Sequence, residues 1–251
     1  MSELQTAFTA YFSDPFVFAD VLNVHLHRGI RIFLPEYLAC TKPPIFCRRE
    51  ENRFLLFQND LSMNYEEEGA VRTRYLLDFC LNPEPSMLRF MNPEEAVILP
   101  ESFMKRTSRS EALSSGTMIR LLFYAGKPLK NSEIRNDFIP GQLGLDCSPF
   151  LSMPQGILFP EEADDCWFEP CFSDYRFVGK ILKYRNQKET AESLVMTFMN
   201  TDPKDASIRF LHMVFEALHS DLSEELKAKT SLSRIPVPAA GQTLPRTHLT
   251  F

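Results

Sequence analysis

The pattern of apolar positions predicts a helix near the start of the chain. Ser13-Asp14-Pro15 has the form of a helix start, in which a capping side chain is followed by a proline in the first turn. Gly29 is expected to end this helix. Before it, apolar side chains recur at helical spacing: Phe16, Ala19, Val21, Leu22 and Leu26. Residues 30–33 are expected to be extended, and residues 35–38 predict a short turn or helix.

Two apolar runs that follow predict a β-hairpin. Residues 45–50 and 53–59 have the composition of strands, and Glu51-Asn52 between them fits a tight turn. Three further short apolar runs predict strands, the first of which could also be a short buried helix: 96–99, 118–124 and 156–159. Gly126-Lys127-Pro128 is expected to end the second of these.

Three consecutive glutamates, 66–68, are expected to begin a helix that runs from about Gly69 to Leu81. Acidic side chains favour the positive N-terminal end of a helix. We therefore interpret these glutamates as a solvated helix start and not as a metal cluster. Three more helical segments are predicted near the C-terminus: 173–186, 188–200 and 204–219.

The order of these elements predicts an α/β core followed by a helical C-terminal section. We expect an α/β domain over residues 1–200, a C-terminal helical extension over 201–230, and a proline-containing, disordered tail over 231–251. The chain has 251 residues, of which 44% are hydrophobic and 24% charged, so it is long and apolar enough for a packed core.

Charge narrows the choice of partner. The formal net charge is −6, whereas proteins that bind duplex DNA usually present a basic face. A local basic patch that binds DNA remains an alternative, because four arginines lie near the predicted hairpin: Arg48, Arg49, Arg72 and Arg74. DNA is therefore a possible partner, while the sequence predicts neither a protein partner nor an oligomeric state.

The sequence predicts a cytoplasmic protein that does not cross a membrane. It has neither a basic start with an apolar signal core nor an apolar run of spanning length. Six cysteines without a C-x-x-C pair argue against a zinc ribbon and fit a reducing compartment. Three of them lie in apolar sequence and are expected to be buried: Cys40, Cys47 and Cys80.

The most suggestive chemistry lies where the run 53–59 ends. Gln58 and Asp60 are two residues apart, so a strand would point both side chains to one face. A polar pair at the end of a buried strand is where α/β enzymes often place their chemistry. This pair is therefore the first candidate for a site.

Four segments, in this order, carry a resemblance to a known family: Phe12-Ser13-Asp14-Pro15 with Phe18-Ala19-Asp20-Val21-Leu22-Asn23, Gly29-Ile30-Arg31-Ile32 with Pro35-Glu36-Tyr37-Leu38, Leu122-Phe123-Tyr124-Ala125-Gly126-Lys127-Pro128, and Ser173-Asp174-Tyr175-Arg176 with Leu182-Lys183-Tyr184. They resemble the recombination-promoting nuclease (Rpn) family, also called YhgA-like putative transposases, of the PD-(D/E)XK nuclease superfamily. The resemblance covers residues from about 11 to 190.

The resemblance implies a PD-(D/E)XK nuclease-like mixed sheet flanked by helices, and a Mg²⁺-dependent DNA endonuclease linked to mobile elements or recombination. The family's active site uses an aspartate on one strand and a glutamate-x-glutamine on the next. Two such carboxylates can hold magnesium, which prefers oxygen ligands. The ion then activates water and offsets the charge of the scissile phosphate.

The acidic motif of this chain departs from that pattern. Gln58-Asn59-Asp60 corresponds in position to the family's glutamate-x-glutamine, but here the amide comes first and the acid second. Glu50 is the best match to the preceding aspartate, but hairpin pairing would place it opposite Arg53, about 23 Å from Asp60 at about 3.3 Å per residue. Asp20 on the first helix is the other candidate acid.

The resemblance then implies that Asp60 binds the ion, that Gln58 orients water or substrate, and that Asp20 or Glu50 supplies the second acid. Because the motif is degenerate, a second function stays open, a non-catalytic binding or assembly protein on the same scaffold. A third, a nucleic-acid reader without cleavage, requires the four arginines to line one basic groove.

Overall fold

The computed structural model describes residues 2–43, 45–50, 53–81, 96–98, 117–126 and 155–222. For the short strands near residues 45–58 and 96–98, and for residue 155, it describes the backbone alone. The predicted tail at 231–251 lies outside the described residues.

A five-stranded mixed sheet forms the centre of the protein, in the order β1-β4-β5-β7-β8. Its strands are β1 (Leu38–Thr41), β4 (Leu61–Glu67), β5 (Ala70–Cys80), β7 (Thr117–Tyr124) and β8 (Gln155–Leu158). The first three pair antiparallel, while β7 lies parallel to β5 and β8 lies parallel to β7. The sheet is therefore a short meander extended by two parallel strands.

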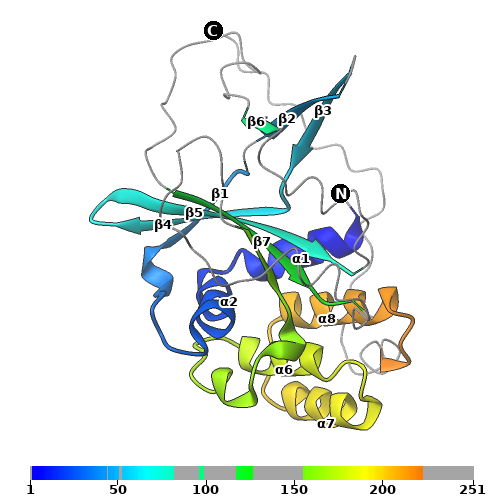
Figure 1. Ribbon diagram of the computed structural model, residues 1–251. Coiled ribbons are helices and arrows are strands. Elements are labelled where there is room, and N and C mark those ends of the chain that lie inside the picture. The colour runs from blue at the N-terminus through cyan, green and yellow to red at the C-terminus, as the bar shows by residue number, and fades with distance from the viewer. Residues whose placement is uncertain are drawn as a thin grey trace, which may run out of the picture.

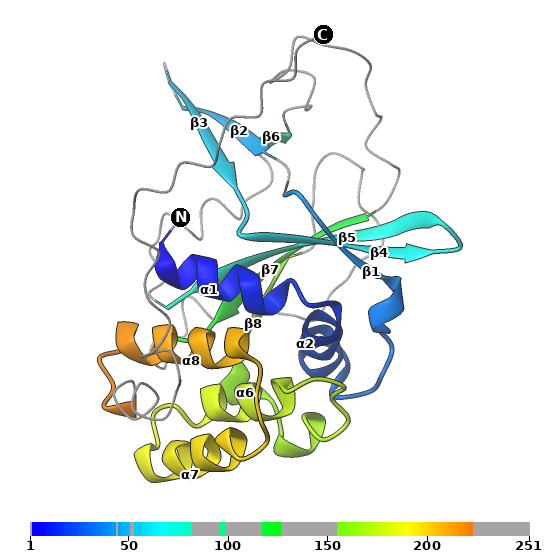
Figure 2. The ribbon, with the colours of Figure 1, turned by 180° about the vertical axis from the view of Figure 1, so that it is seen from behind.

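The helices lie together on one side of this sheet, as both ribbon views show (Figures 1 and 2). They are α1 (Glu3–Phe12), α2 (Pro15–His27), α6 (Tyr175–Lys183), α7 (Lys188–Met199) and α8 (Asp205–Ala217). The described residues also include three short 3₁₀ helices: η1 (Pro35–Tyr37), η3 (Pro160–Glu162) and η4 (Asp165–Trp167). The coarse α/β prediction is thus confirmed. No helix within the described ranges is long and apolar enough to cross a membrane.

A second, three-stranded sheet in the order β3-β2-β6 stands on the other side of the main sheet (Figure 1). It consists of β2 (Ile45–Glu50), β3 (Arg53–Gln58) and β6 (Ala96–Ile98). In the antiparallel β2–β3 pair, Glu50 is opposite Arg53 and Ile45 is opposite Gln58. The predicted hairpin and its register are confirmed.

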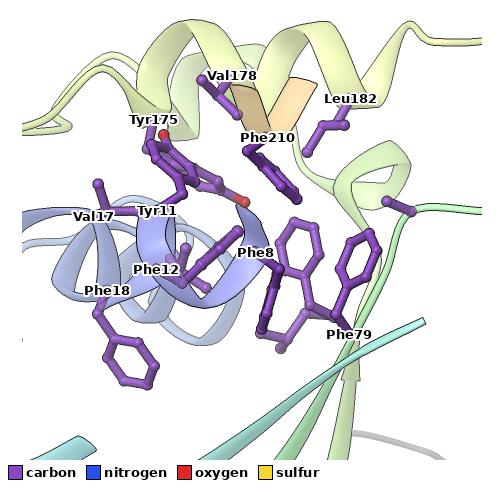
Figure 3. Packing of buried hydrophobic residues seen from close by; sticks show 14 of the residues in the cluster. Phe8, Tyr11, Phe12, Val17, Phe18, Phe79, Tyr175, Val178, Leu182 and Phe210 are labelled. Carbon is purple, nitrogen blue, oxygen red and sulfur yellow. The ribbon is translucent and has the colours of Figure 1, made fainter. Parts of the chain in front are cut away.

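The main core lies between the sheet and the helices, where aromatic rings from distant segments meet (Figure 3). Phe8 packs on Phe12 and Phe79 with ring centroids 4.5 and 4.9 Å apart. Phe210 of α8 stacks on Tyr11 of α1 at 5.4 Å. The predicted C-terminal helical extension therefore contributes α8 to the same core as the first helix.

The predicted helix over residues 69–81 is wrong, because this segment is strand β5. Glu68 and Gly69 form the two-residue turn between β4 and β5, and both have the positive φ that a type I′ hairpin turn requires. Tyr75, Leu77 and Phe79 alternate along β5 and face the main core. The strand is buried on both faces near its end, so a helical period and a strand period are hard to separate there.

The cysteine predictions have mixed outcomes. Cys80 is buried in a second apolar cluster, as predicted, with Leu122, Tyr124, Ile157 and Phe159. Cys40 is exposed, so its predicted burial is wrong, because β1 is an edge strand of the sheet. The side chain of Cys47 lies outside the described residues.

The start and end of α2 agree with the sequence signals. Asp14 is the N-cap, its Oδ1 accepts a hydrogen bond from Phe16 N at 2.9 Å, and Pro15 occupies the first turn. The helix ends at Arg28 and Gly29, whose φ angles are 53° and 81°. A Cβ on Gly29 would lie 2.6 Å from the carbonyl oxygen of Trp167, so a close backbone contact also requires glycine here.

Gly29→Ala is therefore expected to lower the free energy of unfolding by about 1–3 kcal/mol, because positive φ and a backbone clash act together. Gly69→Ala is the matched control, since Gly69 also has positive φ but a Cβ there meets no atom within 4 Å. Urea denaturation of both variants should show the larger loss for Gly29→Ala. Equal losses would mean that the contact with Trp167 adds nothing.

Candidate acidic site

Two aspartates lie close together at one end of the sheet, where β4 and β5 pair. Asp60 directly precedes β4 and Asp78 lies near the end of β5, and the pairing of Leu61 with Leu77 brings them together. The backbone N–H of Asp60 donates to Asp78 Oδ1 at 3.1 Å, and the N–H of Phe79 donates to Asp60 Oδ2 at 2.9 Å. Each carboxylate is thus held by the backbone of the opposite strand.

Two further side chains contact Asp78. Asn59 Nδ2 donates to Asp78 Oδ2 at 2.6 Å. Arg120, which projects from β7, places its Nη2 3.4 Å from the same oxygen. The Arg120 side chain is only 5% exposed, so a buried guanidinium supplies part of the positive charge that this carboxylate needs.

The ionised forms of both carboxylates are disfavoured by burial. Burial raises the pKa of Asp60 to about 6, the Phe79 N–H opposes the rise, and the charge of Asp78 adds to it. The pKa of Asp78 is also raised, mainly by burial, although Arg120, Asn59 and the Asp60 N–H each favour its ionised form. A further cation between the two carboxylates would favour the ionised form of both.

This pKa predicts how stability depends on pH. An aspartate with a folded pKa of about 6 and an unfolded value of about 3.9 keeps its proton more tightly in the native state. Its contribution to stability is therefore complete below about pH 4 and is lost as the pH rises through 6. In the absence of divalent ions, Asp60→Asn should remove this loss and exceed the wild type in stability by about 1–3 kcal/mol at pH 7.5.

Urea denaturation in chelator at pH 4.5 and pH 7.5 measures this difference. Glu67→Gln, which removes an exposed acid at the far end of β4, is the control for the removal of one charge. Parallel pH profiles for wild type and Asp60→Asn would show that Asp60 has an ordinary pKa.

The oxygen atoms of this site fit a hard divalent cation. Within the described part of the chain, Asp60 Oδ1 accepts no hydrogen bond, and the buried Asn59 Oδ1 has no partner. Magnesium is commonly bound by one or two carboxylates, with waters and substrate phosphate as its other ligands. Asp60, Asp78 and the Asn59 amide oxygen are the residues that could hold it. The described residues contain no cluster of three or more His, Cys, Asp or Glu side chains suited to a metal.

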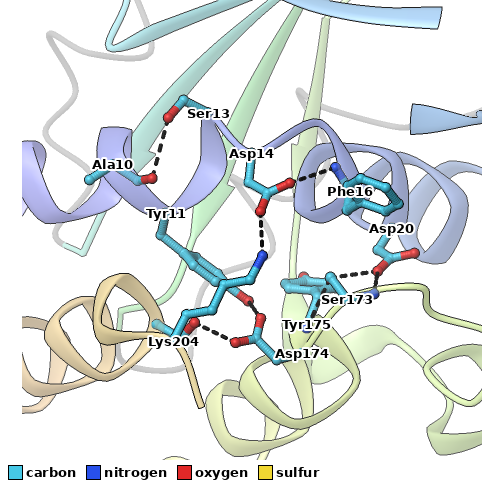
Figure 4. A network of polar contacts seen from close by, with 11 residues as sticks. Ala10, Tyr11, Ser13, Asp14, Phe16, Asp20, Ser173, Asp174, Tyr175 and Lys204 are labelled. Atoms are coloured by element: carbon cyan, nitrogen blue, oxygen red, sulfur yellow. Dashed lines mark hydrogen bonds and ion pairs between the residues drawn. The ribbon is translucent and has the colours of Figure 1, made fainter. Parts of the chain in front are cut away.

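The structure brings Asp78, and not Asp20, to Asp60. Asp20 is buried in α2, and its carboxylate accepts hydrogen bonds from Phe172 N, Ser173 N and Ser173 Oγ at 2.6–2.9 Å. Figure 4 shows its contact with Ser173. Both of its oxygens are used to fix this loop. The predicted role of Asp20 as the second metal ligand therefore lacks support from its contacts.

The other predicted site residues lie on the second sheet or on the β4–β5 hairpin. Gln58 ends β3 and Glu50 ends β2, at opposite ends of the β2–β3 pair, and their side chains lie outside the described residues. The side chains of Arg48 and Arg49 on β2 also lie outside them. The basic groove predicted from these arginines is thus described only in part.

Arg72 and Arg74 on β5 have local polar partners. Arg72 lies 3.8 Å from Glu67 and 3.4 Å from Glu68 next to the hairpin turn. Arg74 Nε donates to Asn64 Oδ1 at 3.0 Å. The charge of Arg72 is therefore partly offset before any phosphate could approach.

Asp78 and Arg120 were missed by the sequence analysis. Asp78 fell in the segment that was predicted to be helical, and Arg120 was treated as part of an apolar strand. The alternation of Val71, Thr73 and Tyr75 was the available signal for a strand that carries Asp78 toward Asp60.

Comparison with known proteins gives no neighbour. No protein-family model matches the chain, and neither a curated protein nor a solved structure is significantly similar to it. The function must therefore be argued from the geometry of the acidic site together with the sequence resemblance.

Proposed function

We propose that the chain is a PD-(D/E)XK-type, Mg²⁺-dependent DNA endonuclease-like protein, of the kind linked to mobile elements or recombination, and that Asp60 and Asp78 are its metal-binding pair. The observation that carries this proposal is the reciprocal hydrogen bonding that fixes the carboxylates of Asp60 and Asp78 where β4 and β5 pair. The resembled family has an aspartate on one strand and a glutamate-x-glutamine on the next. Asp60, directly before β4, and Asp78-Phe79-Cys80 on β5 have that order, with aspartate in the glutamate place and cysteine in the glutamine place.

Each residue has a distinct role in this proposal. A bound magnesium ion would supply an activated water and offset the charge of the scissile phosphate. Asp60 and Asp78 would bind the ion, and Asn59 would orient Asp78 while offering its own amide oxygen. Arg120 would favour the ionised form of Asp78 against the effect of burial. Cys80 is buried among apolar side chains, so it would not replace the glutamine in orienting water.

One observation favours a second candidate function, a non-catalytic binding or assembly protein on the same scaffold. The Arg120 guanidinium lies 3.4 Å from Asp78 Oδ2, so an internal cation already stands beside the carboxylate that the metal would use. If Arg120 replaces the ion, the two aspartates serve only to join β4, β5 and β7.

Cleavage of supercoiled plasmid by the purified full chain separates the two functions. The proposal expects nicking that requires Mg²⁺ or Mn²⁺ and stops on addition of chelator. Glu67→Gln should cleave as the wild type does, because its side chain is exposed on the hairpin away from the site. Absence of cleavage by folded wild-type protein with either ion would overturn the nuclease and favour the non-catalytic scaffold.

A further inference from the structure

A second part of the molecule, unrelated to the acidic site, has the composition of a docking surface. Seven large apolar side chains are exposed among the described residues, and all except Met196 lie within residues 16–37 or at Phe172. Ile30 is 66% exposed, Ile32 49% and Phe172 40%. Exposed apolar side chains that lie together on a surface often mark a site of interaction.

Buried polar side chains of α2 hold the two loops that present these residues. Asn23 Oδ1 accepts hydrogen bonds from Ile32 N and Phe33 N at 2.9 and 2.8 Å, and its Nδ2 donates to Phe33 O at 2.8 Å. Asp20, one turn earlier, accepts hydrogen bonds from the backbone N–H groups of Phe172 and Ser173. Both loops are thus fixed to one face of the same helix.

The two loops also contact each other directly. The Arg31 guanidinium lies 4.1 Å from the centre of the Phe172 ring, and Arg31 Nε donates to Pro170 O at 2.6 Å. Gly29 approaches the backbone of Trp167 so closely that a side chain would not fit. The exposed apolar groups therefore sit on a preorganised backbone, which lowers the entropy cost of binding a partner.

Most of the charge at these loops is positive, and the exposed acid that precedes the second loop, Glu169, forms an ion pair with Lys180. Residues 28–33 and 170–176 contain a single acid, Asp174, and it faces inward to accept hydrogen bonds from Tyr11 and Ser207. Their exposed charges are all positive, although the chain as a whole carries −6. We name this surface the arginine-rimmed patch, and it consists of Arg28, Ile30, Arg31, Ile32, Phe172 and Arg176.

We propose that the arginine-rimmed patch binds a peptide segment of another protein that combines acidic and apolar side chains. Arginine and aromatic residues are the side chains that most often anchor protein interfaces. The aliphatic Ile30 and Ile32 match apolar side chains, and the three arginines match carboxylates. A second copy of this chain does not fit as the occupant, because two-fold pairing would set the arginines of one patch against those of the other.

Selection from a phage-displayed random-peptide library on the immobilised full chain tests this proposal. The expected result is enrichment of peptides rich in acidic and apolar residues. A synthetic copy of an enriched peptide, labelled for fluorescence anisotropy, should bind Ile30→Ser and Arg31→Glu at least about tenfold more weakly than the wild type. Met196→Ser, which removes an exposed apolar side chain elsewhere, should bind normally. Thermal unfolding of each variant shows that it is folded.

Several results would overturn the proposal. These are no enrichment, enrichment of basic or uncharged peptides, or equal binding of the peptide by wild type and both patch variants. Dimerisation in sedimentation that Arg31→Glu abolishes would assign the patch to self-association instead. Binding to anionic vesicles or duplex DNA that Arg31→Glu abolishes, without peptide enrichment, would assign it to a membrane or to nucleic acid.

Discussion

Asp60→Asn is expected to reduce metal-dependent DNA cleavage by at least about 100-fold, because loss of a direct metal ligand costs more than the 10–100-fold typical of outer residues. Asparagine keeps an oxygen that can accept the Phe79 N–H bond, so the strand pairing is retained. The variant loses the negative charge of Asp60, whose Oδ1 accepts no hydrogen bond from the described residues. It should therefore stay folded while losing the ion.

Single-turnover cleavage of plasmid in Mn²⁺ measures this loss, with Glu67→Gln as the charge-matched control. Circular dichroism and thermal unfolding show whether each protein is folded. Cleavage by Asp60→Asn within about threefold of the wild type would assign the activity to another site or to a contaminating nuclease, since one lost ligand should cost far more.

Arg185→Met is expected to destabilise the fold by about 3–5 kcal/mol, the typical cost of removing one partner from a buried ion pair. The Arg185 side chain is fully buried. Its Nε and Nη2 donate to Gly126 O, Nη1 donates to Leu182 O at 2.6 Å, and Nη2 lies 2.6 Å from Glu161 Oε2. Methionine fills similar space but leaves these acceptors without a donor.

Arg185 also supports the candidate site indirectly. Gly126 follows the end of β7, the strand that carries Arg120, so the guanidinium fastens this strand to α6 and η3. Equilibrium urea denaturation of Arg185→Met measures the loss. Lys188→Met is the control, because the ion pairs of Lys188 with Glu192 and Asp221 are exposed and should contribute at most about 1 kcal/mol. Similar losses in the two variants would contradict a special role for Arg185.

Much of the fold could be predicted where local signals were strong. Asp14 and Pro15 marked the start of α2, and Gly29 marked its end. The hairpin of β2 and β3, strand β7 and the three C-terminal helices were also predicted within a few residues. These features depend on capping, turn chemistry and short-range periodicity, which a single sequence displays directly.

The candidate site was harder to predict because its contacts are non-local. Asp60 and Asp78 are brought together by strand pairing, and Arg120 reaches Asp78 from 42 residues further along the chain. In the sequence, glutamates 66–68 favoured a helix start. In the structure, Glu68 has a positive φ and lies in the turn that leads into strand β5. Burial of that strand on both faces, which only the tertiary structure reveals, decided the outcome.

Asp20 shows a different limit of the sequence. An acid on the predicted helix after Pro15 was a reasonable metal ligand, but its oxygens accept hydrogen bonds from the backbone at residues 172 and 173. A carboxylate buried in this way serves the loop that it holds, and the sequence alone gives no sign of a partner 152 residues away.

The central claim is that Asp60 and Asp78 together bind one divalent ion, and thermal unfolding with and without millimolar Mn²⁺ tests it most directly. A ligand that binds only the native state raises stability by about 2.7 kcal/mol at 100 times its dissociation constant. We expect Mn²⁺ to raise the Tm of the wild type and of Glu67→Gln, and to leave the Tm of Asp60→Asn and Asp78→Asn unchanged. No shift in the wild type, or an equal shift in all four proteins, would contradict the claim and leave Arg120 as the resident cation of the pair.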